Sequence, residues 1–537
     1  MRIRTTSFPR LLALGLAVQA LPAQTPCGPP RLQSVPVPTE SVDTRIHDVA
    51  ALSASDAWAV GTYRVPTAGN SEWFSYTLHW DGISWQQVAA PSPPVSPGVR
   101  MCELWAVAAI APNDVWAAGW KYIAFPNNGH IGPQLFVLRW DGSQWNEMPA
   151  PIPYFSYMAS SSGSVIKRIH ARSATDIDFW GFWSGDEVSP QGQVVWHWDG
   201  SGYTREHLPL ISSARNVVVD ATVAGPGELW AIANTGGGNY RPYLARRTSA
   251  GWSMVNPPTQ ALAYYRLSAV AATAANDLWV AGYEQTFSPP QTLPYVVHWD
   301  GSRFNRVPTT GFPSRLIAFA PNDVWAFGTT IEHWDGSAWT VAEPLAGRSN
   351  AQFLGASAAG PCTMFAGGTQ HLDSGGFYIV PLAAAVGPSG SGEARVRPSC
   401  SGVPLRCSLL PSNAPTLGRT FGVGIDDLGR ETGIAPATAV TFYLLGAGPA
   451  PGWPCGVSLP GLGANGGPAD LMLDPTLPFA MTGPQAWQRH GEPARHAIAI
   501  PNQGSLLNRR LYTQGVLVDV TSLRAVLTSG VDLRIGR

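Results

Sequence analysis

Two short motifs alternate along the first two-thirds of the chain and constrain its fold more than any other feature. One reads Asn-Asp-Val-Trp-Ala-x-Gly and is clearest at Asn113–Gly119 and Asn322–Gly328. The other reads His-Trp-Asp-Gly-Ser-x-Trp and is clearest at His333–Trp339. Each motif returns about once per 50 residues, and a period of that length with one hairpin per copy is typical of a β-propeller.

The first motif predicts the two inner strands, A and B, of each blade. An apolar stretch such as Leu267–Ala272 precedes a turn rich in Asn and Asp, whose side chains bond the backbone two residues on. In the third copy Asp178 stands where the anchoring tryptophan is expected, and the seventh copy is the weak sequence 364–367. Tryptophan anchors the other copies, at Trp58, Trp116, Trp230, Trp279 and Trp325.

The second motif predicts the outer hairpin, strands C and D. Asp-Gly between alternating apolar residues favours a two-residue type I′ turn, in which both central residues take positive φ. Such a turn puts Trp80 and Trp85 on one face of the hairpin and His79 on the other. The turn pairs are Asp81-Gly82, Asp141-Gly142, Asp199-Gly200, Asp300-Gly301 and Asp335-Gly336, with Ala250-Gly251 in the fourth copy.

The seventh copy lacks a D strand. It has A, B and a C-like strand at 376–382, and the segment 31–36 near the N-terminus resembles the D strand that begins at Trp85. We therefore expect an all-β fold, a seven-bladed propeller over 24–382 closed by the N-terminal strand. Closure of this kind hides sheet edges that would otherwise invite aggregation.

The N-terminus predicts export. Arg2, Arg4 and Arg10 precede an apolar run, 11–21, that is too short for a membrane span, and Ala20 and Ala23 offer cleavage sites. Residues 1–23 are therefore expected to be a signal peptide, and no later segment is apolar enough to cross a membrane. The mature protein is expected to be a secreted, periplasmic or cell-surface monomer.

The charge of the chain argues against nucleic-acid binding. Charged residues make up 13% of 537 residues and the formal net charge is −1, which leaves no basic stripe for phosphates. Metal-ligand, nucleophile-elbow and phosphate-loop motifs are absent from the sequence, so no cofactor or metal is expected.

Export permits disulfides, and the chain has six cysteines. Their spacing does not match a zinc site, and the sequence cannot choose among the possible pairings. Cys27 precedes the closing strand and Cys362 lies in the A–B turn of the same blade, which would allow a clasp. Cys400 and Cys407 could close a small loop in the second domain.

A second domain follows a Gly- and Ser-rich linker at 383–394. Short alternating runs recur over 395–537, separated by Gly and Pro, and predict a β-sandwich. The sequences Ile500-Pro501-Asn502, Leu511–Gln514 and Leu533–Gly536 resemble C-terminal modules on exported proteins of planctomycete-type bacteria.

The repeat region is similar to kelch and galactose-oxidase-type propellers in its period and hairpin pattern. That resemblance implies a fold and no activity. The residues of the copper-radical oxidases have no counterpart here. In the sialidase Asp-box the Asp and Gly are one residue apart, whereas in this chain they are adjacent.

Residues that recur in every copy of the repeat are expected to have structural roles. The repeated tryptophans are expected to be core, because burying one such ring is worth roughly 4–6 kcal/mol gross. The histidines of the C strands belong to different blades and cannot converge on one metal, so we expect them to pack between blades; they are His79, His197, His298 and His333. A functional site should instead break the symmetry.

The copies differ most in the connections between strands B and C and between blades. Four of these were expected to be long, irregular loops, and such loops on a rigid scaffold are where binding usually resides. The expected loops are 62–76, 120–134, 151–163 and 283–294. Aromatic residues outside the repeat lie in or beside these connections and are candidate ligand contacts, namely Trp73, Trp120, Trp183 and Tyr283.

Arginines gather near the same face. Arg45, Arg168, Arg266 and Arg315 all lie at the start of an innermost strand and could ring the channel mouth, where they would bind a carboxylate or sulfate. The alternative is that these arginines pair with Asp48 or Glu103.

The sequence thus favours an exported, non-catalytic propeller that binds a glycan or protein through its long-loop face. A carbohydrate-active enzyme of glycosidase or lyase type on the same face is the alternative, although nothing in the spacing pairs Glu72, Asp186, Glu187 or Glu284. A structural component of the cell envelope is a further alternative.

Overall fold

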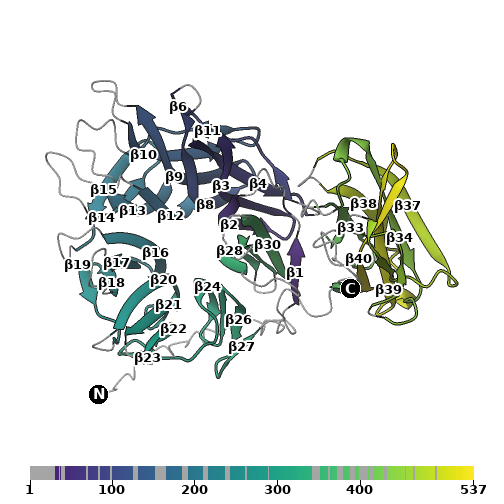
Figure 1. Cartoon of the computed structure of the whole chain (residues 1–537). Coiled ribbons are helices and arrows are strands. Elements are labelled where there is room, and N and C mark those ends of the chain that lie inside the picture. The colour runs from purple at the N-terminus through teal and green to yellow at the C-terminus, as the bar shows by residue number, and fades with distance from the viewer. Residues whose placement is uncertain are drawn as a thin grey trace, which may run out of the picture.

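A computed structural model of the chain shows two β domains (Figure 1). The residues that it describes are 31–35, 37, 43–67, 70–82, 85–96, 99–124, 131–151, 165–183, 192–209, 216–235, 242–259, 263–287, 289–341, 351–360, 363–371, 379–387, 393–397, 409–411, 415–427, 432–453, 455–463, 466–489 and 493–536.

Seven four-stranded antiparallel sheets form the blades of a propeller within the described part of the chain. Blade 1 contains β2 (Thr44–Ser53), β3 (Asp56–Thr67), β4 (Asn70–Trp80) and β5 (Trp85–Gln87). Blade 2 contains β8 (Cys102–Ala111), β9 (Asp114–Ala124), β10 (Ile131–Trp140) and β11 (Trp145–Glu147). Blade 3 contains β12 (Val165–Ser173), β13 (Asp176–Trp183), β14 (Gly192–Trp198) and β15 (Tyr203–His207).

Blades 4 to 6 continue the order around the ring. Blade 4 contains β16 (Asn216–Gly225), β17 (Glu228–Thr235), β18 (Pro242–Thr248) and β19 (Gly251–Val255). Blade 5 contains β20 (Ala263–Ala274), β21 (Asp277–Phe287), β22 (Pro290–Trp299) and β23 (Phe304–Arg306). Blade 6 contains β24 (Pro313–Ala320), β25 (Asp323–Gly328), β26 (Ile331–Trp334) and β27 (Trp339–Val341). A small hairpin, β6 (Pro94–Ser96) and β7 (Val99–Arg100), joins blades 1 and 2.

Blade 7 is closed by the N-terminal strand, as the sequence predicts. Its sheet order is β1 (Arg31–Val35), β30 (Ile379–Gly387), β29 (Thr363–His371) and β28 (Ala351–Gly360). The C strand of this blade runs on to residue 387, with Ala383 paired to Val35. The predicted linker 383–394 is therefore partly strand, because its alanines and Val386 pair between two strands.

The C-terminal domain is a sandwich around one core. A five-stranded sheet contains β31 (Glu393–Arg397), β40 (Arg524–Arg534), β39 (Arg510–Asp519), β34 (Ala439–Gly446) and β37 (Phe479–Trp487). A three-stranded sheet contains β32 (Leu409–Pro411), β33 (Thr420–Ile425) and β38 (Ala494–Ala499), and a small pair contains β35 (Val457–Leu459) and β36 (Ala469–Leu471). Phe421 and Val423 of the smaller sheet share a buried cluster with Tyr443 and Leu517 of the larger.

Two short 3₁₀ helices, η1 (Pro436–Thr438) and η3 (Gly504–Leu506), complete the described elements. Among the described residues, no helix has both the length and the apolar character needed to cross a membrane.

The inner strand of every blade has a β-bulge at the same place. In β2 the register skips His47, between the pairs Ile46–Gly61 and Asp48–Val60. The bulge explains the glycine of the first motif, because a Cβ on Gly61 would lie 1.9 Å from the carbonyl oxygen of Arg45. Equivalent close approaches occur at Gly119, Gly181, Gly282, Gly328 and Gly368.

The outer hairpins differ from the predicted turn. In blade 2 Trp140 pairs with Trp145, so the loop has four residues, and only its glycine, Gly142, takes positive φ (97°). In blade 2 the carboxylate of Asp141 accepts backbone hydrogen bonds from Ser143 and Gln144, at 2.8 and 2.9 Å. These Asx-type hydrogen bonds stabilise a four-residue loop in which one residue has positive φ, whereas a type I′ turn needs two such residues. The two tryptophans of the hairpin still share a face, as predicted.

The described parts of three of the four expected loops are paired strands that form hairpin arms. β3 and β4 pair out to Thr67 and Asn70, β9 and β10 to Ala124 and Ile131, and β21 and β22 to Phe287 and Pro290. Alternating side chains let these strands continue beyond the ring. The fourth expected loop, 151–163, lies almost entirely outside the described residues. We call the face that carries the arms the long-loop face, and the opposite one, with the A–B and C–D turns, the short-turn face.

Candidate functional site

The centre of the propeller is occupied by four charged side chains, which we call the charge quartet: Asp48, Arg168, Asp220 and Arg315. Arg168 Nη1 lies 3.3 Å from Asp48 Oδ2, and Arg168 Nε lies 2.8 Å from Asp220 Oδ1. Arg315 bridges the same two carboxylates, with both distances 2.9 Å. Because the four residues come from blades 1, 3, 4 and 6, these contacts span the ring whose inner strands are seen in Figure 1.

Small residues make room for the quartet. The seven positions that follow the bulges are Asp48, Ala106, Arg168, Asp220, Ala269, Arg315 and Gly355. A Cβ on Gly355 would lie 2.4 Å from the Cα of Asp48, so no larger residue fits there. Two arginines and two aspartates therefore fill the channel with balanced charge.

The quartet accounts for two of the predicted anion-binding arginines. Burial alone would raise the pKa of Asp220, but Arg315 and Arg168 outweigh it and hold that pKa below its usual value. Arg168 and Arg315 have side chains only 12% and 14% exposed and are each shared between two carboxylates. Their charge is thus satisfied inside the channel, which corresponds to the pairing alternative rather than to a free anion site.

A second group of residues lies nearer the long-loop face, and we call it the mouth cluster: His47, Glu103, Trp105, Trp120 and Lys167. The imidazole of His47 stacks on the indole of Trp105, with 4.3 Å between ring centroids. The ammonium of Lys167 lies 2.9 Å from the centroid of the Trp105 ring. The indole N–H groups of Trp105 and Trp120 both donate to Glu103 Oε2, at 2.9 and 3.0 Å.

The electrostatics of the mouth cluster are set by burial. Desolvation lowers the pKa of Lys167 to about 7, although the nearby Glu103 favours the charged form. Burial also raises the pKa of Glu103, against the effects of Lys167 and the two indole donors. The pKa of His47 falls to about 4 for the same reason, so this ring is neutral near pH 7.

Lys167 and Arg266 are the cations of this region without carboxylate partners. Among the described residues, neither has an Asp or Glu oxygen within 4.0 Å, and Arg266 is exposed. The positive charge of Arg266 is close enough to lower the pKa of Lys167. Arg45, by contrast, bonds Asp43 at 2.8 Å. The mouth therefore presents two cations beside aromatic rings, neither in contact with a carboxylate of the described residues, although Glu103 acts on Lys167 at longer range.

The predicted aromatic contacts lie on strands, and the structure brings only some of them together. Trp120 belongs to the mouth cluster, and half-buried Tyr283 is the cross-strand partner of Arg266. Trp73 lies on the arm of blade 1, where its backbone bridges to Met101, and its side chain contacts none of the mouth cluster in the described structure. The side chain of Trp183 lies outside the described residues.

The repeated histidines are structural, but they pack within their own blades and not between blades as expected. His298 stacks on Trp279 with ring centroids 4.4 Å apart, and its Nε2 lies 2.6 Å from Asp277 Oδ1. Blade 2 replaces the histidine with Arg139, which lies over Trp116 and bonds Asp114. Within the residues described, no group of three or more His, Cys, Asp or Glu could hold a metal ion.

The predicted disulfide cysteines, Cys27, Cys362, Cys400 and Cys407, all lie outside the described residues, as does the predicted signal peptide 1–23. Cys455 of the sandwich, which the prediction left out, is disulfide-bonded.

A cavity of about 790 Å³ lies between blades 3 and 4. Its lining includes Arg172, His197 and the A–B turn residue Gly227, which places it on the short-turn face. The sequence prediction placed binding on the opposite face, and the residues of this cavity were not among its candidates.

Sequence signals for both sites existed. The chain has only two lysines, and Lys167 occupies a bulge position beside the channel. Asp178, which lines the cavity, is the one polar residue at the aromatic anchor position of the repeat. Loop length points to the connections on the long-loop face, whereas these two substitutions within the repeat mark the sites that the structure shows.

Comparison with known proteins assigns the chain to no family. No known protein-family profile matches the chain, and no curated protein is significantly similar to it. Among solved structures, YCF48 from Cyanidioschyzon merolae is 16% identical over 66% of this chain and 98% of its own, with a TM-score of 0.39. An α-L-arabinofuranosidase from Fusarium graminearum is 12% identical over 66% and 97%, with a TM-score of 0.38.

A polysaccharide lyase, ulvan lyase, is 13% identical over 65% of this chain and 95% of its own, with a TM-score of 0.40. The chain is an all-β protein, a β-propeller followed by a smaller β-sandwich. These likenesses concern fold alone, and neither the kelch-type nor the planctomycete-type resemblance gains support from them.

Proposed function

We propose that the protein is an exported, non-catalytic recognition propeller that binds an anionic glycan at the channel mouth on its long-loop face. The observation that carries the proposal is the position of Lys167, whose ammonium lies against an indole and contacts no carboxylate among the residues that the structure describes. Placing such a charge in a desolvated site costs free energy unless an anion compensates it. A carboxylate or sulfate of the ligand would do so.

The surroundings favour a sugar acid or sugar sulfate over a bare ion. Arg266 provides a second, exposed cation whose planar fork can bind a carboxylate or sulfate through two hydrogen bonds. Trp120 and Tyr283 are both half-buried and provide ring surface near these cations. Below them the charge quartet is neutral, so it does not compete for the ligand.

A glycan array tests the proposal. We expect the protein to bind carboxylated or sulfated glycans more tightly than their neutral counterparts, and Lys167→Met to lose at least about tenfold in affinity, the value of one charge-assisted hydrogen bond. Lys121→Met is the matched control, because it removes the other lysine of the chain, which pairs with Glu147 at 2.5 Å. Equal binding by wild type and Lys167→Met would refute the assigned site.

The carbohydrate-active alternative uses the same residues. A lysine whose pKa is about 7 beside a glutamic acid whose pKa is raised has the acid–base character that catalysis needs. The glycans bound on the array should therefore also be incubated with the protein and sized. Shortening of the glycan by wild type and not by Lys167→Met would favour the enzyme, whereas intact glycan supports recognition alone.

A further inference from the structure

Aromatic contacts join most neighbouring blades of the propeller. The anchor ring of one blade packs on an outer-strand ring of the next, as Trp58 does on Trp140 with 4.9 Å between centroids and Trp279 on Trp334 with 5.2 Å. The same contact joins blades 2 and 3, 4 and 5, and 7 and 1. Each contact buries two large rings where the wedge-shaped blades meet.

The interface between blades 3 and 4 lacks this pair of rings, and its aromatic contact is instead Trp180 of blade 3 against Trp252 of blade 4, with 6.2 Å between centroids. Asp178 replaces the anchor of blade 3, at the register position where Trp279 pairs with His298 in blade 5. Arg247 of blade 4 replaces the outer-strand tryptophan, at the position of Trp80 in blade 1. Replacing two indoles with an aspartate and an arginine leaves space, and the cavity of about 790 Å³ lies there.

His197 differs from the equivalent histidines in having no anchor tryptophan of its own blade to stack on. Its counterparts in blades 1, 5 and 6 each stack on the anchor tryptophan of their own blade, with ring centroids 4.4 to 4.5 Å apart. In blade 3 the His197 Nδ1 instead lies 2.9 Å from Asp178 Oδ1, and Arg172 Nη1 donates to Asp178 Oδ2 at 2.9 Å. The imidazole therefore has a carboxylate where the other blades offer it a ring.

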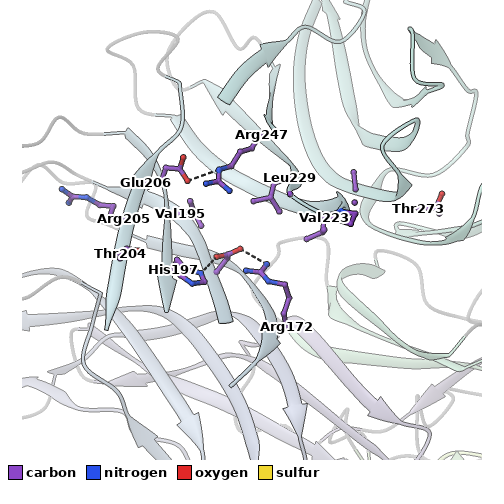
Figure 2. A pocket seen from close by; sticks show the side chains of 15 residues that line it. Arg172, Val195, His197, Thr204, Arg205, Glu206, Val223, Leu229, Arg247 and Thr273 are labelled. Carbon is purple, nitrogen blue, oxygen red and sulfur yellow. Dashed lines mark hydrogen bonds and ion pairs between the residues drawn. The ribbon is translucent and has the colours of Figure 1, made fainter. Parts of the chain in front are cut away.

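The walls of the cavity combine apolar and polar groups. Val195 and Leu229 contribute apolar surface. Figure 2 shows His197 and Arg172 on one side of the space and the pair of Glu206 and Arg247, 3.2 Å apart, on the other. His197 and Arg172 both bond the carboxylate of Asp178. The volume lies within the range of about 300–1,000 Å³ typical of small-molecule sites.

We propose that this cavity binds an aromatic ring with a polar N–H or O–H edge, such as an indole or a phenol. Imidazole and guanidinium planes stack on aromatic faces, as His298 and Arg139 do elsewhere in this chain. The carboxylates of Asp178 and Glu206 supply acceptors for the polar edge of the ring. The guest ring thus takes the place of the missing indoles.

The ring can belong to a free aromatic compound or to a tryptophan or tyrosine of a peptide, since both offer the same chemistry. The site lies on the short-turn face, so it is independent of the glycan site at the channel mouth. Either site can fail without affecting the other.

Calorimetric titration of the full chain tests the inference, with indole, N-acetyltryptophanamide and N-acetylleucinamide as probes. We expect both indoles to bind with a dissociation constant below about 1 mM, and the leucine compound at least about tenfold more weakly. Tighter binding of the tryptophanamide than of indole identifies a peptide as the source. Tighter binding of indole identifies a free compound. Failure of both indoles to bind, or equal binding of the leucine compound, overturns the proposal.

Two variants locate the binding. Asp178→Trp restores the repeat residue and fills the space, so it should reduce indole affinity at least about tenfold. If Asp178→Trp does not fold, Thr204→Trp serves instead, because Thr204 is exposed at the rim and a ring there covers the opening. Thr340→Trp is its control, since Thr340 pairs with His333 in blade 6 as Thr204 does with His197 in blade 3. Unchanged affinity in the blocking variant, or equal loss in the control, refutes the site.

Discussion

At the scale of single residues, the motif glycines show how local backbone geometry determines residue identity. Gly61 does not need positive φ; glycine is favoured because the Arg45 carbonyl oxygen beside the bulge in β2 occupies the space that a side chain would fill. Blade 4, whose backbone differs locally, has Ala233 at this position. A sequence pattern reveals that a glycine recurs, but only the strand register reveals which neighbour excludes a Cβ.

Gly61→Ala should therefore lower the free energy of unfolding by at least about 2 kcal/mol, because the 1.9 Å contact is with backbone that cannot swing away. Gly202→Ala is the matched control, since a Cβ there meets nothing within 4 Å. Denaturant unfolding of both variants measures the difference. Similar stability of the two proteins would show that the bulge relaxes at little cost.

Lys167 gives a prediction about pH. Its pKa of about 7 means that the ammonium is present at pH 6 and largely lost at pH 8.5. Affinity for an anionic glycan should accordingly fall about tenfold over that interval, by the value of a charge-assisted hydrogen bond. Titrations at the two pH values measure it.

Lys167→Arg is the control for this pH dependence, because arginine stays charged throughout the interval. We expect this variant to bind equally at both pH values. A wild-type affinity that does not change with pH would place the binding charge on another residue.

At the scale of elements, the sequence predicts strand order and blade closure well and strand ends poorly. The period-2 alternation and the Asp-Gly pairs are sufficient to define four strands per blade, including β1 as the last strand of blade 7. The same alternation continues through the segments read as loops, such as 62–76, because Thr, Tyr and Trp suit a two-stranded arm as well as an irregular connection.

The inner strands carry the charge quartet, and its coupling is testable. Asp48→Ala leaves Arg168 and Arg315 facing Asp220 alone, so it should cost about 3–5 kcal/mol in the free energy of unfolding. Removing Arg315 as well restores the charge balance, so the double variant should lose less than the sum of the single losses.

Asp43→Ala serves as the comparison, because it breaks a pair with the more exposed Arg45 and should cost less than about 1 kcal/mol. Chemical denaturation of the four variants gives the coupling energy. Additive losses would show that the four charges of the channel act independently.

At the scale of the whole molecule, the sequence repeat is sufficient to predict the fold but does not indicate where the functional site lies. The repeated tryptophans pack between blades, whereas the turn aspartates and most of the repeated histidines bond and stack within a blade. The mouth cluster combines residues of blades 1, 2 and 3, with Arg266 of blade 5 nearby, and these residues approach one another only when the ring closes. The positions of His47, Glu103 and Lys167 along the chain therefore do not predict that these residues lie close together.

The sequence contains clearer signals for the cavity between blades 3 and 4 than for the mouth cluster. Asp178 interrupts an otherwise aromatic column, and Arg247 interrupts the column beside it. What the sequence does not show is that the two columns face each other across an interface, so that two separate exceptions produce one space.

The most direct test of the account is an anomalous difference map from crystals soaked in selenate, which mimics a sulfate ester and needs no knowledge of the natural glycan. We predict a strong peak within hydrogen-bonding distance of Lys167 Nζ and the Arg266 guanidinium in crystals at about pH 6, where Lys167 is charged. Selenate bound at other arginines, with no density beside Lys167, would contradict the central claim.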